Sequence, residues 1–325
     1  MRRPRFYNLR KIAFGVFQFA PDGFGSRFAC NSSGASHFNW INRQKSSQIV
    51  LRLRFYFFFR KILTFSIDFF RKFMQNIGIM KKETLAKLID HTMLAQTAGI
   101  KEITRLCAEA KKYNFKSVCV NPIYVPLCKN ELAQSDVKIC TVIGFPLGAA
   151  TTSCKAAEAA EAIANGADEV DMVINSGAAL ECRFSSIEMD ISEVVQAART
   201  AGQKQGKTVV VKVILETCFI SDETITTCCQ CAVRAGADFV KTSTGFATPK
   251  DSSGNILPNG ASAHHVAIMR SAVGKDFGVK ASGGIRNAKK AAEMIAVGAN
   301  RIGTSSGIQI IENWDESIKF PGWDD

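Results

Sequence analysis

The stretch that decides the fold is Gly166-Ala167-Asp168-Glu169-Val170-Asp171-Met172-Val173-Ile174-Asn175. Its glycine can end a helix in the left-handed conformation, and a run typical of a buried strand follows at once. The same junction recurs at Gly236-Ala237-Asp238 and at Gly298-Ala299-Asn300, each time before an apolar run. This repetition predicts helices that end directly before buried strands.

Short β-rich runs follow Met80, and Ala-rich segments with helical patterning separate most of them. Eight runs are predicted strands: Ala86–Met93, Ser117–Asn121, Lys138–Phe145, Glu169–Asn175, Thr208–Glu216, Phe239–Thr244, Gly278–Gly283 and Arg301–Thr304. Six segments are predicted helices: Ile100–Tyr113, Cys154–Asn165, Ser186–Thr200, Asp222–Ala235, Ser262–Val273 and Ala288–Val297. Several of these helices follow a Thr, Ser or Asn that can cap them.

This alternation of strands and helices predicts a parallel sheet. Eight units in the 246 residues from Met80 to Asp325 fit a (β/α)8 barrel, which typically has about 250 residues. A doubly wound open sheet is the alternative fold. The barrel is favoured because the first strand is not followed by the Gly-rich turn of a dinucleotide site.

Composition separates the chain into two parts. The 325 residues are 46% hydrophobic, which excludes extended disorder and a collagen-like fold. The 11 cysteines are too few for a small disulfide-stabilised scaffold. Residues 1–79 contain 14 Lys and Arg but only Asp22 and Asp68 as acids, which accounts for the whole net charge of +12. They also hold 15 of the 23 Phe residues. We therefore divide the chain into a basic leader, 1–79, and a barrel domain, 80–325.

The leader has no charge-free window of about 18 residues and no secretory-signal pattern. A transit peptide, a membrane-surface anchor and a nucleic-acid-binding segment remain alternatives. We favour a start codon assigned too early, because Met80-Lys81-Lys82-Glu83 resembles an ordinary start of a soluble protein. On that hypothesis neither a membrane nor a nucleic acid is expected as a partner.

The ten cysteines after Met80 lie mostly within apolar runs, which is typical of buried thiols in a reducing compartment and predicts a cytoplasmic protein. Cys228 and Cys231 form a C-x-x-C pattern, but no second pair or nearby histidine completes a zinc site. No zinc site is therefore expected at this pair, and we expect no other cofactor.

Four successive predicted strands each carry one charge within an apolar run: Asp171, Lys212, Lys241 and Lys280. Neighbouring strands lie about 4.8 Å apart, so these side chains can converge at one mouth of the barrel. Burying four charges by chance is costly, and one acid among three lysines leaves a cationic excess that a packing role does not explain.

A cluster of lysines suits covalent catalysis. A lysine with an ordinary pKa is only about 0.04% neutral at pH 7, and only the neutral amine attacks a carbonyl. A second ammonium and partial burial both favour the neutral form. Lys241 and Lys280 on consecutive strands are thus a candidate nucleophile and tuning pair, in an order that spacing alone leaves open, while Asp171 and Lys212 could transfer protons.

Small and polar turns follow the last three predicted strands. Thr242-Ser243-Thr244-Gly245-Phe246 could hydrogen-bond a sugar. Ser282-Gly283-Gly284-Ile285-Arg286 and Gly303-Thr304-Ser305-Ser306-Gly307 follow the seventh and eighth strands, where barrels often bind phosphate through backbone N–H groups. The sequence therefore predicts a phosphorylated sugar as the substrate.

Together these motifs resemble the class I deoxyribose-phosphate aldolase family over Met80–Gly307. The motifs that carry the resemblance are Ile89-Asp90-His91-Thr92, Val118-Cys119-Val120-Asn121-Pro122, Val142-Ile143-Gly144-Phe145-Pro146-Leu147-Gly148, Gly166 to Asn175, Val211-Lys212-Val213-Ile214-Leu215-Glu216-Thr217, Gly236 to Phe246, and Val279-Lys280-Ala281-Ser282-Gly283-Gly284. The resemblance implies reversible cleavage of 2-deoxy-D-ribose 5-phosphate to acetaldehyde and D-glyceraldehyde 3-phosphate, without a metal.

The resemblance also implies roles for individual residues. Lys241 matches the Schiff-base lysine, Lys280 matches the lysine that lowers its pKa, and Asp171 with Lys212 matches the proton-transfer pair. Phosphate-loop positions are matched by Gly245, Gly283, Gly284, Ser305 and Ser306, and positions near the sugar hydroxyls by Asp90, Thr92 and Thr244. Some members end in a tyrosine that reaches the site, whereas this chain ends in Phe320-Pro321-Gly322-Trp323-Asp324-Asp325.

Other interpretations remain open. Another Schiff-base sugar-phosphate lyase or a transaldolase would share a lysine and phosphate turns, and a non-catalytic module could act on membranes or nucleic acid through the leader. We interpret His91 as structural, and His264 and His265 as surface or helix-packing residues. A homodimer is a further expectation, by analogy with similar barrels.

Overall fold

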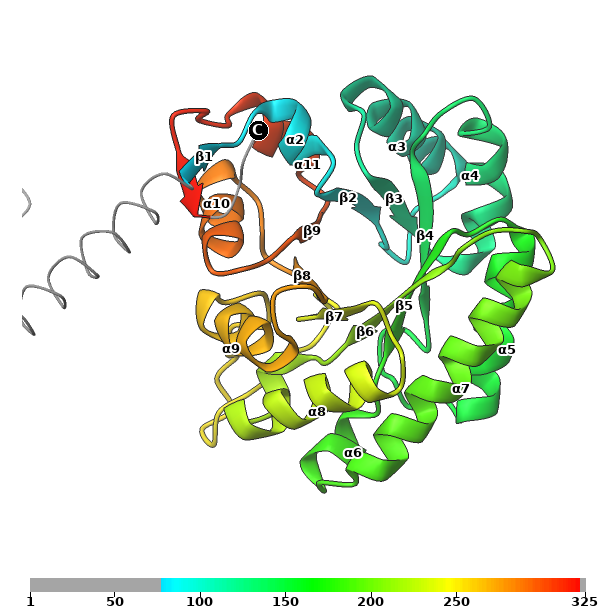
Figure 1. The fold of residues 1–325 in the computed structure, drawn as a ribbon, viewed down its shortest axis with the longest axis vertical. Helices are drawn as coiled ribbons and strands as arrows, with labels where there is room; N and C mark the ends of the chain where they lie inside the picture. Colours follow the sequence, from blue (N-terminus) through cyan, green and yellow to red (C-terminus); the bar gives the residue numbers. More distant parts are fainter. Residues whose placement is uncertain (1–76, 322–325) are drawn as a thin grey trace, which may run out of the picture. The chain divides into compact units, whose positions relative to one another are not determined.

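The computed structural model describes residues 77–321, and eight parallel strands in it close into a barrel (Figure 1). The strands are β2 (Ile89–Met93), β3 (Ser117–Val120), β4 (Lys138–Ile143), β5 (Glu169–Val173), β6 (Val210–Ile214), β7 (Phe239–Lys241), β8 (Gly278–Ser282) and β9 (Arg301–Thr304). They pair in chain order, and β9 closes the barrel against β2. The predicted (β/α)8 barrel is therefore confirmed.

Helices surround the barrel (Figure 1). They are α2 (Lys82–Ala86), α3 (Ile100–Tyr113), α4 (Val125–Glu131), α5 (Thr152–Asn165), α6 (Ser176–Leu180), α7 (Phe184–Gln203), α8 (Asp222–Arg234), α9 (Ala263–Val273), α10 (Ala288–Ala296) and α11 (Gly307–Glu312). All six predicted helices are present. The sequence did not signal α2, α4, α6 and α11, because segments of 5 to 7 residues are too short to establish a helical period. None of the helices in residues 77–321 is long and apolar enough to cross a membrane.

Two further strands, β1 (Ile77–Ile79) and β10 (Lys319–Pro321), pair antiparallel. Strand β1 thus belongs to the last three residues of the segment that we separated as a leader. Residues 1–76 lie outside the described residues. The proposed start at Met80 and the alternatives for the leader therefore stay predictions.

The repeated helix–strand junction has two structural functions. Gly166, Gly236 and Gly298 adopt φ values of +125°, +79° and +109°, which residues with a Cβ rarely reach. The third residue of each junction then accepts a backbone N–H from the preceding strand: Asp168 from Ile139, Asp238 from Val211 and Asn300 from Val279, at 2.8–3.0 Å. Each junction therefore ends a helix and also fixes the next strand beside its neighbour.

Side chains on each strand alternate between the helices and the barrel interior. On β5, Val170 and Met172 belong to the main apolar core between strands and helices, whereas Glu169 and Asp171 are absent from it. The register places Asp171 beside Lys212, and Lys241 beside Lys280. The outward residues stabilise the fold, and the inward residues form the candidate site.

Candidate active site

The four charges predicted from the strands meet inside the barrel. Asp171 Oδ2 accepts hydrogen bonds from Lys241 Nζ at 2.7 Å and from Lys280 Nζ at 2.8 Å. Its other oxygen, Oδ1, accepts one from Lys212 Nζ at 2.9 Å. One carboxylate therefore holds three ammonium groups, and Lys241 and Lys280 share a single oxygen atom of it.

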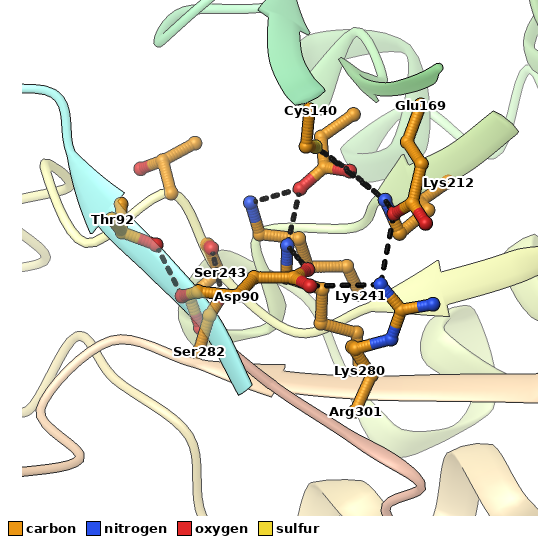
Figure 2. Close-up of polar contacts among 12 residues, drawn as sticks. Asp90, Thr92, Cys140, Glu169, Lys212, Lys241, Ser243, Lys280, Ser282 and Arg301 are labelled. Carbon is orange, nitrogen blue, oxygen red and sulfur yellow. Dashed lines mark hydrogen bonds and ion pairs between the residues drawn. The ribbon is translucent and has the colours of Figure 1, made fainter. Parts of the chain in front are cut away.

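Three more buried charges lie beside this group (Figure 2). Arg301 Nη1 donates to Asp90 Oδ1 at 2.7 Å and to Glu169 Oε2 at 2.8 Å. Glu169 Oε2 also lies 2.5 Å from Lys212 Nζ, and Asp90 forms a close ion pair with Lys280. The cationic excess is thus smaller than the sequence suggested, because four cations face three carboxylates rather than one.

Charged partners hold Asp171, Lys212 and Lys280 ionised despite the burial of these three side chains. Burial disfavours the Asp171 carboxylate, but Lys212, Lys241 and Lys280 together keep its pKa well below the usual range. Burial likewise disfavours the ammonium groups of Lys212 and Lys280, yet Asp171 and the neighbouring acids raise the pKa of both lysines. Lys212 and Lys280 therefore remain cationic at neutral pH.

A cavity of about 800 Å³ opens above this group. Of the seven charges, all within the described part of the chain, only Lys241 lines it. The Lys241 side chain is 4% exposed, compared with 0% for Lys212 and 1% for Lys280. A ligand in the cavity can thus reach the amine of Lys241 but not those of the other two lysines.

Glycine-rich turns form one wall of the cavity. Gly283, Gly284 and Ser305 line it, and the two glycines have φ values of +86° and +73°. Gly245 lies against Gly283, with 3.8 Å from a Cβ built on Gly245 to the Cα atom of Gly283. Ser306 lines a neighbouring cavity of about 390 Å³ instead. Four of the five predicted phosphate-loop residues therefore lie at or beside one wall, where the backbone N–H groups of glycine-rich turns suit an anion.

The residues predicted near sugar hydroxyls occupy different positions. Thr92 and Thr244 line the cavity, whereas Asp90 is fully buried among the ion pairs beneath it. Thr92 Oγ1 donates to the Asp90 carbonyl at 2.8 Å. Thr244 Oγ1 donates to the buried Glu216 carboxylate and accepts the Phe246 N–H at 3.0 Å. Both hydroxyls thus already have protein partners.

Two groups of possible metal ligands occur among the described residues. Donor atoms of Cys119, Cys140 and Asp171 lie within 4.8 Å of one another, as do those of Asp90, Cys140 and Glu169. Cys140 Sγ donates to Asp171 Oδ1 at 3.2 Å. All three carboxylates already bind lysine or arginine, so the protein's own cations occupy the places that a metal ion would need.

The three histidines among residues 77–321 are bound to partners other than the lysines of the site. His91 is buried outside the barrel, where its Nε2 lies 2.8 Å from Glu109 on α3. The exposed His264 pairs with Asp222, and His265 Nδ1 lies 3.1 Å from Thr217 Oγ1. The C-x-x-C pair, Cys228 and Cys231, consists of buried free thiols on α8.

Sequence reasoning missed Glu169 and Cys140 as members of the site, and did not identify Arg301 as a partner of the acids. A signal for Glu169 existed, because it lies two residues before Asp171 and hence on the same face of one strand. Arg301 likewise begins its strand in the register of Lys280. The contact of Arg301 with Asp90 required the closed barrel, because the two residues are 211 positions apart in the chain.

Comparison with known proteins gives consistent results. Residues 84–313 match the family described as DeoC/LacD family aldolase. A deoxyribose-phosphate aldolase of a Thermoanaerobacter species is 50% identical over 232 residues, which are 71% of this chain and 97% of that protein. One of Bacillus cereus is 51% identical over 229 residues, 70% of this chain and 95% of its own. The solved structure of the tetrameric deoxyribose phosphate aldolase of Aeropyrum pernix has a TM-score of 0.62 at 35% identity, covering 71% of this chain and 91% of that one.

Proposed function

The chain belongs to the DeoC/LacD family of aldolases, and on this basis we propose that it cleaves 2-deoxy-D-ribose 5-phosphate reversibly to acetaldehyde and D-glyceraldehyde 3-phosphate. Lys241 forms the Schiff base in this proposal. The observation that carries the assignment is that Lys241, alone among the seven charges of this buried cluster, lines the cavity.

The reaction begins when the neutral amine of Lys241 attacks the aldehyde carbon of the open-chain sugar. A carbinolamine forms and loses water, which gives an imine. Loss of the proton from the hydroxyl on C3 then drives cleavage of the C2–C3 bond, because the imine accepts the electron pair as an enamine. Protonation of C2 and hydrolysis of the imine release acetaldehyde and return the free amine.

Asp171 and the two deeper lysines support the proton transfers. Asp171 binds the Lys241 amine directly, and Lys212 and Lys280 bind the same carboxylate. A proton can therefore move between the reacting amine and this group, through a water molecule where the substrate separates them. Lys280 supplies a fixed positive charge beside Lys241, which favours the neutral form of the reacting amine.

The glycine-rich wall supplies the phosphate site. Gly283, Gly284 and Ser305 line the cavity together with Lys241, so a phosphate bound there places the rest of the sugar over the amine. Gly245 lies beside this wall, and Ser306, which follows Ser305 in the chain, lines the neighbouring cavity. Thr92 near the end of β2 and Thr244 after β7 contact the sugar from the strands that flank β8 and β9, and Asp90 acts from below through Lys280.

Borohydride trapping tests the proposal. Reduction in the presence of 2-deoxy-D-ribose 5-phosphate should add a stable mass to the peptide that contains Lys241, and acetaldehyde should be released in the absence of borohydride. The variant Lys241→Leu is the control and should acquire no label. Labelling of another lysine, or cleavage of a different sugar phosphate only, would support another Schiff-base lyase or a transaldolase instead.

We also propose that the protein works in the cytoplasm as a homodimer. The ten cysteines that the structure describes are all free thiols, which suits a reducing compartment. A pair is the commonest closed assembly of identical chains. Sedimentation velocity of the full chain should give twice the monomer mass of 35.5 kDa, and a monomer or tetramer would contradict this.

A further inference from the structure

The buried ion pairs form a closed ring. Starting from Arg301, the contacts pass through Asp90, Lys280, Asp171, Lys212 and Glu169, and then return to Arg301. Cations and carboxylates alternate around this ring, so each member has two partners of opposite charge. The ring contains three of each and is neutral as a whole.

Lys241 lies outside the ring. Among the described residues its ammonium contacts one carboxylate, Asp171, which two ring lysines already share. Loss of a proton from Lys212 or Lys280 would leave the ring with an unpaired negative charge in the barrel interior. Loss of a proton from Lys241 leaves the neutral ring intact. The arrangement therefore singles out Lys241 as the group that can become neutral.

We infer that Arg301 and Glu169 are positioning residues that set the protonation state of Lys241 by closing this ring on the side away from the cavity. The inference rests on the proposed function for its catalytic meaning, but its physical content concerns only the charge on Lys241. The guanidinium carbon of Arg301, Cζ, also lies 5.1 Å from the centroid of the Phe239 ring. This packing helps to hold the guanidinium between Asp90 and Glu169.

Opposite effects follow from removing the two residues. Without Arg301, three carboxylates face three lysines, so the proton on Lys241 balances the interior charge and is held more tightly. Without Glu169, two carboxylates face four cations, so the same proton is released more easily. Removing both restores the original difference of one positive charge.

Other ionisable groups also face Lys241 and remain unchanged in these variants. They are Cys119 on β3, Asp171 on β5 and Glu216 after β6, together with Lys212 and Lys280, which bind the same carboxylate as Lys241. Asp90 on β2 and Cys140 on β4 contact members of this set. Because this set is common to all the proteins compared, differences between them report the deleted charge.

The test measures how fast acetic anhydride labels Lys241 as a function of pH, read by mass spectrometry of its peptide. This rate follows the neutral fraction of the amine whether or not the protein is an aldolase. Arg301→Met should move the midpoint to higher pH by about 1 unit or more, and Glu169→Gln should move it to lower pH by a similar amount. The midpoint of the double variant should return toward the wild-type value. The midpoint of Arg301→Lys should stay close to that value, because this substitution keeps the charge.

Thermal unfolding of each variant at pH 7 shows whether it is folded. If Arg301→Met does not fold, Glu169→Gln can still be compared with Arg301→Lys and with the double variant. That comparison decides whether loss of the Glu169 charge moves the pH midpoint of Lys241 labelling down or up. Equal midpoints in the folded variants, or shifts in the same direction for both deletions, would overturn the inference. If the labelling midpoints shift as expected but borohydride does not trap substrate on Lys241, the proposed function is rejected and the inference about the ring stands.

Discussion

The two faces of the same barrel strands have opposite chemistry. Toward the helices, residues such as Val170, Met172 and Val213 pack into one apolar core, whereas toward the barrel axis the same strands carry Asp171 and Lys212. Both faces are buried. The outward face stabilises the fold by removing apolar surface from water, and the inward face holds charges whose burial costs free energy and is offset by pairing. Stability and chemistry are thus separated across a single layer of backbone.

The largest expected effect is on the inward face. Lys241→Leu should lower kcat/KM for 2-deoxy-D-ribose 5-phosphate by at least about 10⁴-fold, because the covalent step is lost. The free energy of unfolding should change by less than about 2 kcal/mol, since the remaining ring is neutral. Steady-state kinetics and urea unfolding measure the two effects. Substantial residual activity would show that the inward face works without this amine.

A substitution on the outward face should have the reverse effect. Met172→Ala should lower the free energy of unfolding by about 2–5 kcal/mol, because it leaves a cavity in the apolar core. At 25 °C the folded protein should keep a kcat/KM close to that of the wild type. Val233→Ala on α8, where the side chain is 41% exposed, is the control and should have little effect on either quantity. A large loss of activity in Met172→Ala would mean that the two faces are coupled.

Lowering the pH should reduce the stability contributed by the inward-facing charges before it affects the outward-facing apolar core. Lysine and arginine neighbours hold the pKa values of Asp90 and Asp171 below the usual range, against the effect of burial. Their contribution to stability is therefore complete above the unfolded pKa near 4 and is lost as the pH falls toward the folded pKa. Between pH 5 and pH 3 we expect a loss of about 1 kcal/mol for each carboxylate. Urea unfolding at these pH values measures it.

A smaller loss over the same pH range in Asp171→Asn would confirm the origin of this acid sensitivity. An equal loss in that variant would assign the effect to carboxylates elsewhere in the protein.

The smallest expected effect is at the outer surface. His264 and Asp222 form an ion pair at 2.7 Å, but the two side chains are 66% and 48% exposed. His264→Ala should therefore change the free energy of unfolding by less than about 1 kcal/mol and leave kcat/KM unchanged. Thermal unfolding and kinetics at pH 6 measure both. A larger effect would show that exposed ion pairs stabilise this protein as much as buried ones do. The contrast between the barrel interior and the outer surface would then be wrong.

Much of the site could be predicted because alternation along a strand is a local property. The charges at Asp171, Lys212, Lys241 and Lys280 stand out within apolar runs, and their strands are consecutive, so their convergence followed from the order of the chain. Gly283 and Gly284 could be placed at the same mouth of the barrel for a similar reason, because they lie at the end of a predicted strand, and both line the cavity.

The other members of the ring could not be placed in this way. Asp90 was assigned to the sugar hydroxyls from family resemblance, but it lies beneath the cavity between Arg301 and Lys280. Glu169 lies on the same strand face as Asp171, but the sequence does not show that its carboxylate binds Lys212 and Arg301. Only pairing of β9 with β2 brings Asp90 to Arg301, and that contact spans nearly the whole barrel sequence.

By itself, the sequence determined the barrel and the strands that carry charge, because helix-ending glycines and period-two alternation act over a few residues. The tertiary structure decided which lysine meets the cavity and which charges neutralise one another. Barrel closure and the stagger between strands set the depth of each side chain along the axis, and depth determines both exposure and the choice of ionic partner.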